Sequence, residues 1–168
     1  MRIHLIIIAC CCLFTACNKA GNNEKKTEKE CDFNDTLNAN SLPFSAYINQ
    51  SIWVADSVKV IGGTLLNGNP AEVIHATGKL GNKNIIMQVW LELYSGVKIY
   101  TLKKSHCSGR YVEDSLQVFQ SDIACEAPGL VNILSDTAGM ITGIFHFTAK
   151  DAGNHEVKIA GGYFRAKK

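Results

Sequence analysis

Hydrophobic and polar residues alternate along most of the chain from Pro43 onward, in short runs that glycine, asparagine and aspartate interrupt. A period of two indicates strands with one buried face, and turn residues at this frequency are typical of antiparallel β proteins. The pattern therefore predicts an all-β domain over 43–168, a single antiparallel β-sandwich or open β-barrel of roughly eight to ten strands. The expected strands are 44–49, 51–60, 71–79, 84–94, 97–103, 109–121, 129–135, 139–149 and 155–165.

Two of these runs define the expected core. In 84–94, one face carries Ile85, Met87, Val89, Leu91 and Leu93, and the other carries Ile86, Gln88, Trp90, Glu92 and Tyr94. In 139–149, the apolar face carries Ile141, Gly143, Phe145, Phe147 and Ala149. Ser95-Gly96 between two alternating runs predicts a two-residue hairpin. The pair Gly161-Gly162 predicts a β-bulge in the last strand.

The first 16 residues have the pattern of an export signal. Arg2 supplies the basic start, and the apolar run Ile3 to Phe14 is shorter than the roughly 20 residues that span a bilayer. Phe14-Thr15-Ala16-Cys17 is typical of a lipoprotein cleavage site, so we expect Cys17 to carry a lipid (a palmitate-containing anchor). A rival site at Cys10, or an ordinary secretory signal, is the alternative.

The segment from Cys17 to residue 42 is polar and almost free of large apolar side chains. Such a stretch buries too little surface to offset its ordering entropy, so we expect a flexible tether between lipid and domain. The expected location is therefore the cell envelope, lipid-anchored at the outer membrane and facing the periplasm or the surface.

The net charge limits the binding partners of the protein, and the cysteine positions limit its disulfides and metal sites. The formal net charge is +2, and the signal contributes only Arg2 to it, which gives no electrostatic case for nucleic-acid binding. An extracytoplasmic location permits disulfides. Cys107 and Cys125 flank one candidate hairpin and are the favoured pair, with Cys31 paired to either of them as the alternative. The spacing lacks Cys-x-x-Cys, so no metal site is expected.

Both ends of the domain resemble a known family. The start F-S-A-Y-I-N at 44–49 with W-V-A at 53–55, and the end G-I-F-H-F-T-A at 143–149 with V-K-I-A-G-G-Y-F at 157–164, resemble small Bacteroidota lipoproteins with a domain of unknown function. The resemblance implies a tethered β-rich fold and supplies no catalytic residues. The chain departs from the family at Gln50-Ser51, where a glycine is usual.

A second resemblance concerns modification. Bacteroidota attach O-glycans at Asp-(Ser/Thr)-apolar triplets, and four triplets here are similar to that pattern. The candidate acceptors are Thr36, Ser57, Ser115 and Thr137. Asp-Ser and Asp-Thr are also common turn openers, so the pattern has a purely structural explanation as well.

No constellation typical of catalysis is present. A Gly-x-Ser-x-Gly elbow, a Ser-x-x-Lys pair and a phosphate-binding loop are all missing from the sequence, so neither enzymatic activity nor a cofactor is expected. Trp53, Trp90 and Tyr94 are candidates for a ligand-binding groove, although core packing is the simpler role for Trp53.

The expected function is non-catalytic binding of a small ligand, a glycan or a partner protein. The alternative is inhibition of a hydrolase. This alternative rests on the segment Ser105-x-x-Ser108-Gly109-Arg110-Tyr111, which faintly resembles a short motif of periplasmic lysozyme inhibitors. Such an inhibitor would contact its target through an exposed loop near 104–111.

Overall fold

The structure, a computed structural model, describes residues 42–64, 68–102, 107–114, 116–121 and 129–168. These residues form strands joined by turns and contain no helix. The strands are β1 (Phe44–Ile48), β2 (Ser51–Val54), β3 (Ser57–Thr64), β4 (Pro70–Leu80), β5 (Lys83–Glu92), β6 (Ile99–Thr101), β7 (Cys107–Glu113), β8 (Gln117–Ser121), β9 (Gly129–Thr137), β10 (Met140–Lys150) and β11 (Glu156–Lys167).

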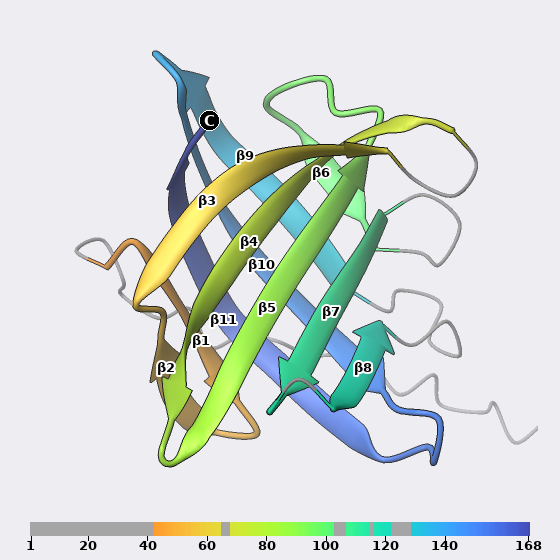
Figure 1. Cartoon of the computed structure of the whole chain (residues 1–168). Coiled ribbons are helices and arrows are strands. Elements are labelled where there is room, and N and C mark those ends of the chain that lie inside the picture. The colour runs from red at the N-terminus through yellow and green to blue at the C-terminus, as the bar shows by residue number, and fades with distance from the viewer. Residues whose placement is uncertain (1–41, 65–67, 103–106, 115, 122–128) are drawn as a thin grey trace, which may run out of the picture.

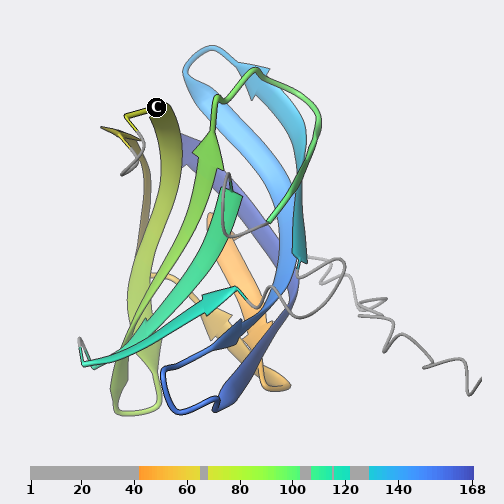
Figure 2. The ribbon, with the colours of Figure 1, turned by 90° about the vertical axis from the view of Figure 1, so that its right-hand side faces the viewer.

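All the strands belong to one antiparallel sheet that curls into a half-barrel (Figure 1). Nine strands follow the order β2-β1-β11-β10-β8-β7-β5-β4-β3, while β9 pairs with β10 and β6. Seen from the side, β4, β5 and β7 form one wall and β9 and β10 the opposite wall (Figure 2). The all-β expectation is confirmed, in its open-barrel form.

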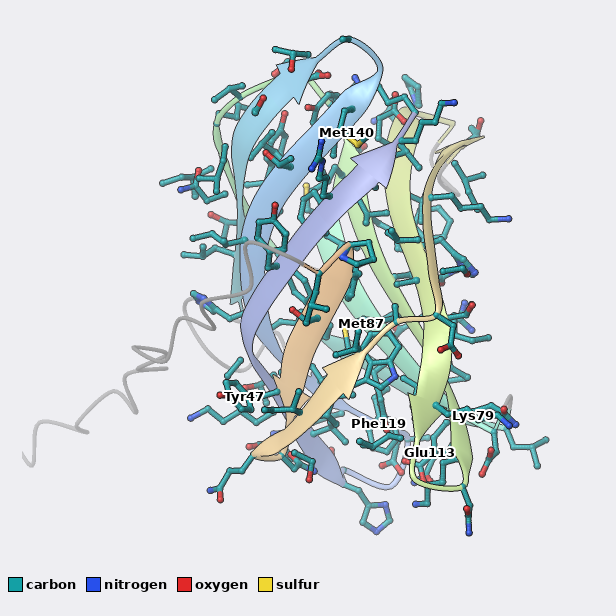
Figure 3. The ribbon with its side chains drawn as sticks, turned by 90° about the vertical axis from the view of Figure 1, so that its left-hand side faces the viewer. Tyr47, Lys79, Met87, Glu113, Phe119 and Met140 are labelled. Atoms are coloured by element: carbon teal, nitrogen blue, oxygen red, sulfur yellow. The ribbon has the colours of Figure 1, made fainter. Side chains whose placement is uncertain are left out.

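Apolar side chains fill the interior of the half-barrel. The buried cluster draws on every strand except β3, and its centre is aromatic: the rings of Phe44 and Phe145 lie 5.1 Å apart, and Phe164 packs against both. Met87 and Phe119, labelled in Figure 3, are 0% and 3% exposed. The alternation expected for 139–149 is confirmed, because Ile141, Phe145 and Phe147 all face this core.

Glycines on the inner face make room for these rings. A Cβ at Gly109 would lie 2.6 Å from the ring of Phe147, and one at Gly162 would lie 2.5 Å from the ring of Phe145. Both distances are shorter than a real carbon contact allows, so each phenylalanine occupies the space that a glycine of another strand leaves free.

Two expected strands are each divided in the structure. The run 51–60 turns a corner at Ala55 and Asp56, whose N–H groups donate to Phe44 and Thr77 on two other strands. The run 109–121 folds back as the β7–β8 hairpin, because Asp114 adopts a left-handed backbone with φ 51°. Short polar residues tolerate that conformation, which a period-two pattern does not reveal.

The hairpin expected at Ser95-Gly96 is wrong. β5 pairs with β4 and β7, whereas β6 pairs with β9. The segment instead closes around Tyr100, whose hydroxyl accepts from the Ser95 N–H at 2.9 Å and donates to the Gly96 carbonyl at 3.1 Å. The bulge expected at Gly161-Gly162 is confirmed by the register shift between β10 and β11.

The signal, Cys17 and the tether lie outside the described residues, so these expectations stay predictions. In the part of the chain that the structure describes, no helix is long and apolar enough to cross a membrane.

Candidate functional site

A hollow of about 550 Å³ opens at one end of the half-barrel, beside the end of β3 and the start of β4. We call it the mouth. Its lining comes from both of these strands and from the two residues after β5: Gly62, Gly63, Thr64, Pro70, Ala71, Glu72, Leu93 and Tyr94. Below the mouth the interior is packed, so a ligand would meet the half-barrel here and not in its core.

The backbone at Leu93 shapes one side of the mouth. Leu93 has φ 49°, and its N–H donates to the Pro70 carbonyl at 3.1 Å, which ends β5. The left-handed conformation reverses the alternation of faces. Leu93, expected in the core, is 58% exposed, and Tyr94, expected on the opposite face, packs against the core. The sequence prediction for these two residues is therefore wrong.

Tyr94 is held from several directions. Its ring stacks on Tyr100 with centroids 5.7 Å apart, and its hydroxyl donates to Asp136 at 3.0 Å. The ammonium group of Lys168 lies 4.8 Å from the ring centroid and 2.8 Å from the Asp136 carboxylate. These contacts fix the ring as a wall of the mouth, and they leave less of its face for a ligand than a free aromatic would offer.

Electrostatics keep this cluster in one protonation state. Burial, together with the Asp136 bond, raises the pKa of Tyr94 well above its usual range. The Lys168 ammonium, assisted by the tyrosine hydroxyl, lowers the pKa of Asp136. At neutral pH the hydroxyl is therefore a donor and the carboxylate an acceptor.

One carboxylate, that of Glu72, lies in the lining of the mouth. Glu72 is half-buried in the lining, and within the described residues it has no hydrogen-bond or ion-pair partner. Glu92, which precedes Leu93, does not line the mouth: it is only 5% exposed and accepts a hydrogen bond from the Asn69 side chain. Glu72 is thus the acceptor that a ligand in the mouth would meet.

The structure does not bring the three predicted aromatic residues together. Trp53 is 1% exposed and packs edge-on against Phe44, with ring centroids 5.6 Å apart, so it belongs to the core. Trp90 is half-buried on the outer face of the sheet, between its strand neighbours Val73 and Ser108. Of the three, only Tyr94 lines the mouth.

The sequence reasoning missed the rest of the mouth. Gly62 and Gly63 fall between the expected strands 51–60 and 71–79 but belong to β3, and Glu72 is one polar residue inside an expected strand. The sequence signal for the mouth is the glycine pair itself, which precedes the turn residues Asn67-Gly68-Asn69-Pro70. Glycine in a strand often marks the close approach of another group or open space. A Cβ at Gly62 would meet nothing within 4 Å.

Cys107 is a free thiol in the structure and is 6% exposed. Burial raises the pKa of this thiol above its ordinary value, so it stays protonated at neutral pH. Its predicted partner Cys125 lies outside the described residues, as does Cys31, and the disulfide stays a prediction.

The loop expected at 104–111 is a strand over its described part. Residues 107–111 belong to β7, with Cys107, Gly109 and Tyr111 facing inward, while 104–106 lie outside the described residues. The expectation of an exposed loop there is therefore wrong for residues 107–111. Only Ser108 and Arg110 of this segment face outward, and they do so from a paired strand and not from a protruding loop.

Two candidate glycosylation sites are described and exposed. Ser57 lies at the start of β3, where its hydroxyl is 2.8 Å from that of Thr77. Thr137 ends β9, beside the tight turn Ala138–Gly139. Thr36 and Ser115 lie outside the described residues. Modification stays a prediction at all four positions.

No group of three or more potential metal ligands occurs among the described residues. Comparisons of the chain with family models, with curated proteins and with solved structures gave no match. The resemblance to the Bacteroidota lipoproteins accordingly stays a prediction.

Proposed function

We propose that this chain is a lipid-anchored protein of the cell envelope that binds a small ligand at the mouth of its half-barrel, without catalysing a reaction on it. The anchor would be Cys17, and the polar segment that follows would hold the domain away from the membrane. The site would then face the solvent outside the cytoplasm.

The observation that carries the proposal is the hollow itself. Its volume of about 550 Å³ falls within the range of ligand pockets, roughly 300–1,000 Å³. The lining combines an apolar side chain, Leu93, with a fixed aromatic ring, Tyr94, and the carboxylate of Glu72, which has no partner within the described residues. Such a mixture suits a compact ligand with an apolar body and a hydroxyl or amino group that donates to the carboxylate.

The chemistry of the described residues favours binding over catalysis. Burial raises the pKa of the Cys107 thiol, and a protonated thiol is a poor nucleophile compared with a thiolate. His75 bonds to the amide of Gln88 and not to a hydroxyl or thiol that it could activate. These observations support a binding protein.

The binding proposal is tested by blocking the mouth. In the Gly62→Phe variant, the new ring enters open space in the mouth, because nothing lies within 4 Å of a Cβ there. A nuclear magnetic resonance titration with small sugars and amines should move the backbone signals of Gly63, Leu93 and Tyr94 in the natural protein and not in the variant. Ser51→Phe, an exposed position on β2, is the matched control.

Signals that move equally in the Gly62→Phe variant would contradict the proposed site. So would a set of sugars and amines none of which moves the signals of the mouth residues.

The anchor has a separate test. Cys17→Ser should transfer the protein from the detergent phase to the aqueous phase in a partition assay, and an unchanged partition would contradict lipidation at Cys17.

A further inference from the structure

A row of polar side chains crosses the outer face of the sheet, away from the mouth. Strand register places one residue from each of five neighbouring strands opposite the next: Lys59, His75, Gln88, Arg110 and Gln120, on β3, β4, β5, β7 and β8. We call this set the outer row. Adjacent strands are about 4.8 Å apart, so the outer row extends about 19 Å.

Hydrogen bonds join the middle of the outer row. The Gln88 amide nitrogen lies 3.0 Å from Nδ1 of His75, and Arg110 Nη1 donates to the Gln88 amide oxygen at 3.4 Å. Burial, with the nearby Lys59 ammonium, lowers the pKa of His75. The neutral ring accepts at Nδ1, which leaves its Nε2–H as a donor for another group.

The register continues the outer row through Lys150 on β10 to Glu156 on β11, and these two side chains pair with each other at 3.9 Å. Lys59 and Arg110, by contrast, have no ion pair within the described residues. Arg110 Nε is buried and has no hydrogen-bond partner within the described residues, which is costly for a guanidinium donor. The rows on either side contain no carboxylate: they consist of Ile61, Val73, Trp90 and Ser108, and of Ser57, Thr77, Ile86, Val112 and Val118. Lys59 and Arg110 therefore lack an acidic partner in these three rows.

The flanking rows restrict the shape of a partner. Apolar side chains border the outer row on both sides, and Trp90 lies directly beside it, half-buried against Val73. An indole at such a position offers an apolar face to the C–H groups of a sugar ring. Cationic groups in a single line, with an aromatic alongside, fit a linear anionic chain better than a broad surface such as a membrane.

From this geometry we infer that the outer row binds a segment of an acidic polysaccharide. Carboxylates or sulfates of the chain pair with Lys59 and Arg110, its hydroxyls bond to Gln88 and His75, and one sugar ring packs on Trp90. The inference is independent of the mouth, which lies at the end of the half-barrel and takes a small ligand.

The test measures retention of the full chain, in a non-ionic detergent, on gels containing homogalacturonan, dextran sulfate or neutral dextran. Retention is expected on at least one of the acidic polymers and not on neutral dextran. Arg110→Gln and Lys59→Gln should each weaken the binding about ten-fold, because a charge-assisted bond is lost. Lys167→Gln on β11 removes the same charge elsewhere and should leave binding within about two-fold.

Three results would overturn the inference. The first is no retention on either acidic polymer, and the second is equal weakening by Lys167→Gln, which would indicate a non-specific charge effect. The third is a loss, in Arg110→Gln, of binding to phosphatidylglycerol vesicles without any binding to polysaccharide, which would identify a membrane-facing surface. Gly62→Phe should not alter retention, so failure at the mouth and failure at the outer row are distinguishable.

Discussion

The two faces of β5 have different surroundings. Its inward residues Ile85, Met87, Val89 and Leu91 are at most 1% exposed and pack in the core. Its outward residues Gln88 and Trp90 are half-buried and contribute to the outer row and its border. The inner face is specified by volume and the outer face by charge and hydrogen bonding, so substitutions on the two faces should have different consequences.

The largest effect is expected from emptying the aromatic core. Phe147→Ala removes a ring with 0% exposure that lies over Gly109, and it should destabilise the domain by about 3–5 kcal/mol. Urea unfolding followed by tryptophan fluorescence measures this change. A loss below about 1 kcal/mol would mean that the interior is loosely packed and that the contrast between the faces is weaker than described.

Adding a methyl group beside the Phe147 ring should destabilise the domain less than removing the ring. Gly109→Ala puts a methyl group 2.6 Å from the Phe147 ring and should destabilise by about 1–3 kcal/mol. Gly62→Ala is the matched control, because its methyl group meets open space, and it should change stability by no more than about 0.5 kcal/mol. Equal costs at the two glycines would contradict the distinction between packed interior and open mouth.

Tyr94→Phe keeps the ring at the mouth and removes its bond to Asp136. One such bond contributes about 0.5–1.5 kcal/mol, so thermal unfolding should shift by a few degrees at most. The stacking on Tyr100 should persist. A loss of unfolding free energy as large as that of Phe147→Ala would show that the hydrogen bonds of the hydroxyl, and not the packing of the ring, hold the mouth together.

The smallest effect is expected at the turn between β10 and β11. The bond from His155 holds the pKa of Asp151 at about 2, below its usual value. A lowered pKa stabilises the fold above pH 4, and this contribution disappears as the pH falls toward 2. Asp151→Asn keeps the acceptor for the Gly153 and His155 N–H groups and removes the charge.

The stability difference between Asp151→Asn and the natural protein should therefore be small at pH 6 and vanish near pH 2. Urea unfolding at several pH values measures it. A difference that grows as the pH falls would reverse the expected sign and contradict the assigned pairing.

The alternation of faces was predictable from sequence wherever a strand stayed regular. The pattern identified Ile85 to Leu91 and Ile141 to Ala149 as core because burial requires a period of two. It failed at Leu93 and Asp114, where a left-handed backbone reverses or ends a strand. That choice depends on bonds to distant segments, such as the one from Leu93 to Pro70, which no local pattern contains.

The candidate sites were harder to predict for a related reason. Trp90 and Tyr94 share one face of the expected strand 84–94, but they lie on different surfaces because the chain reverses its faces at Leu93. The outer row depends on the register of five strands. Among them, β5 and β7 pair although β6 lies between them in the chain. Register is set by the whole sheet, so Lys59 and Arg110 could not be paired with Gln88 from sequence alone.

The central claim, that one strand stabilises with one face and binds with the other, is tested most directly by two adjacent substitutions on β5. Val89→Ala should cost about 2 kcal/mol in urea unfolding and leave retention on the acidic polysaccharide unchanged. Gln88→Ala should cost about 1 kcal/mol or less and weaken retention several-fold. Retention that survives Gln88→Ala, or that is lost in a folded Val89→Ala protein, would contradict it.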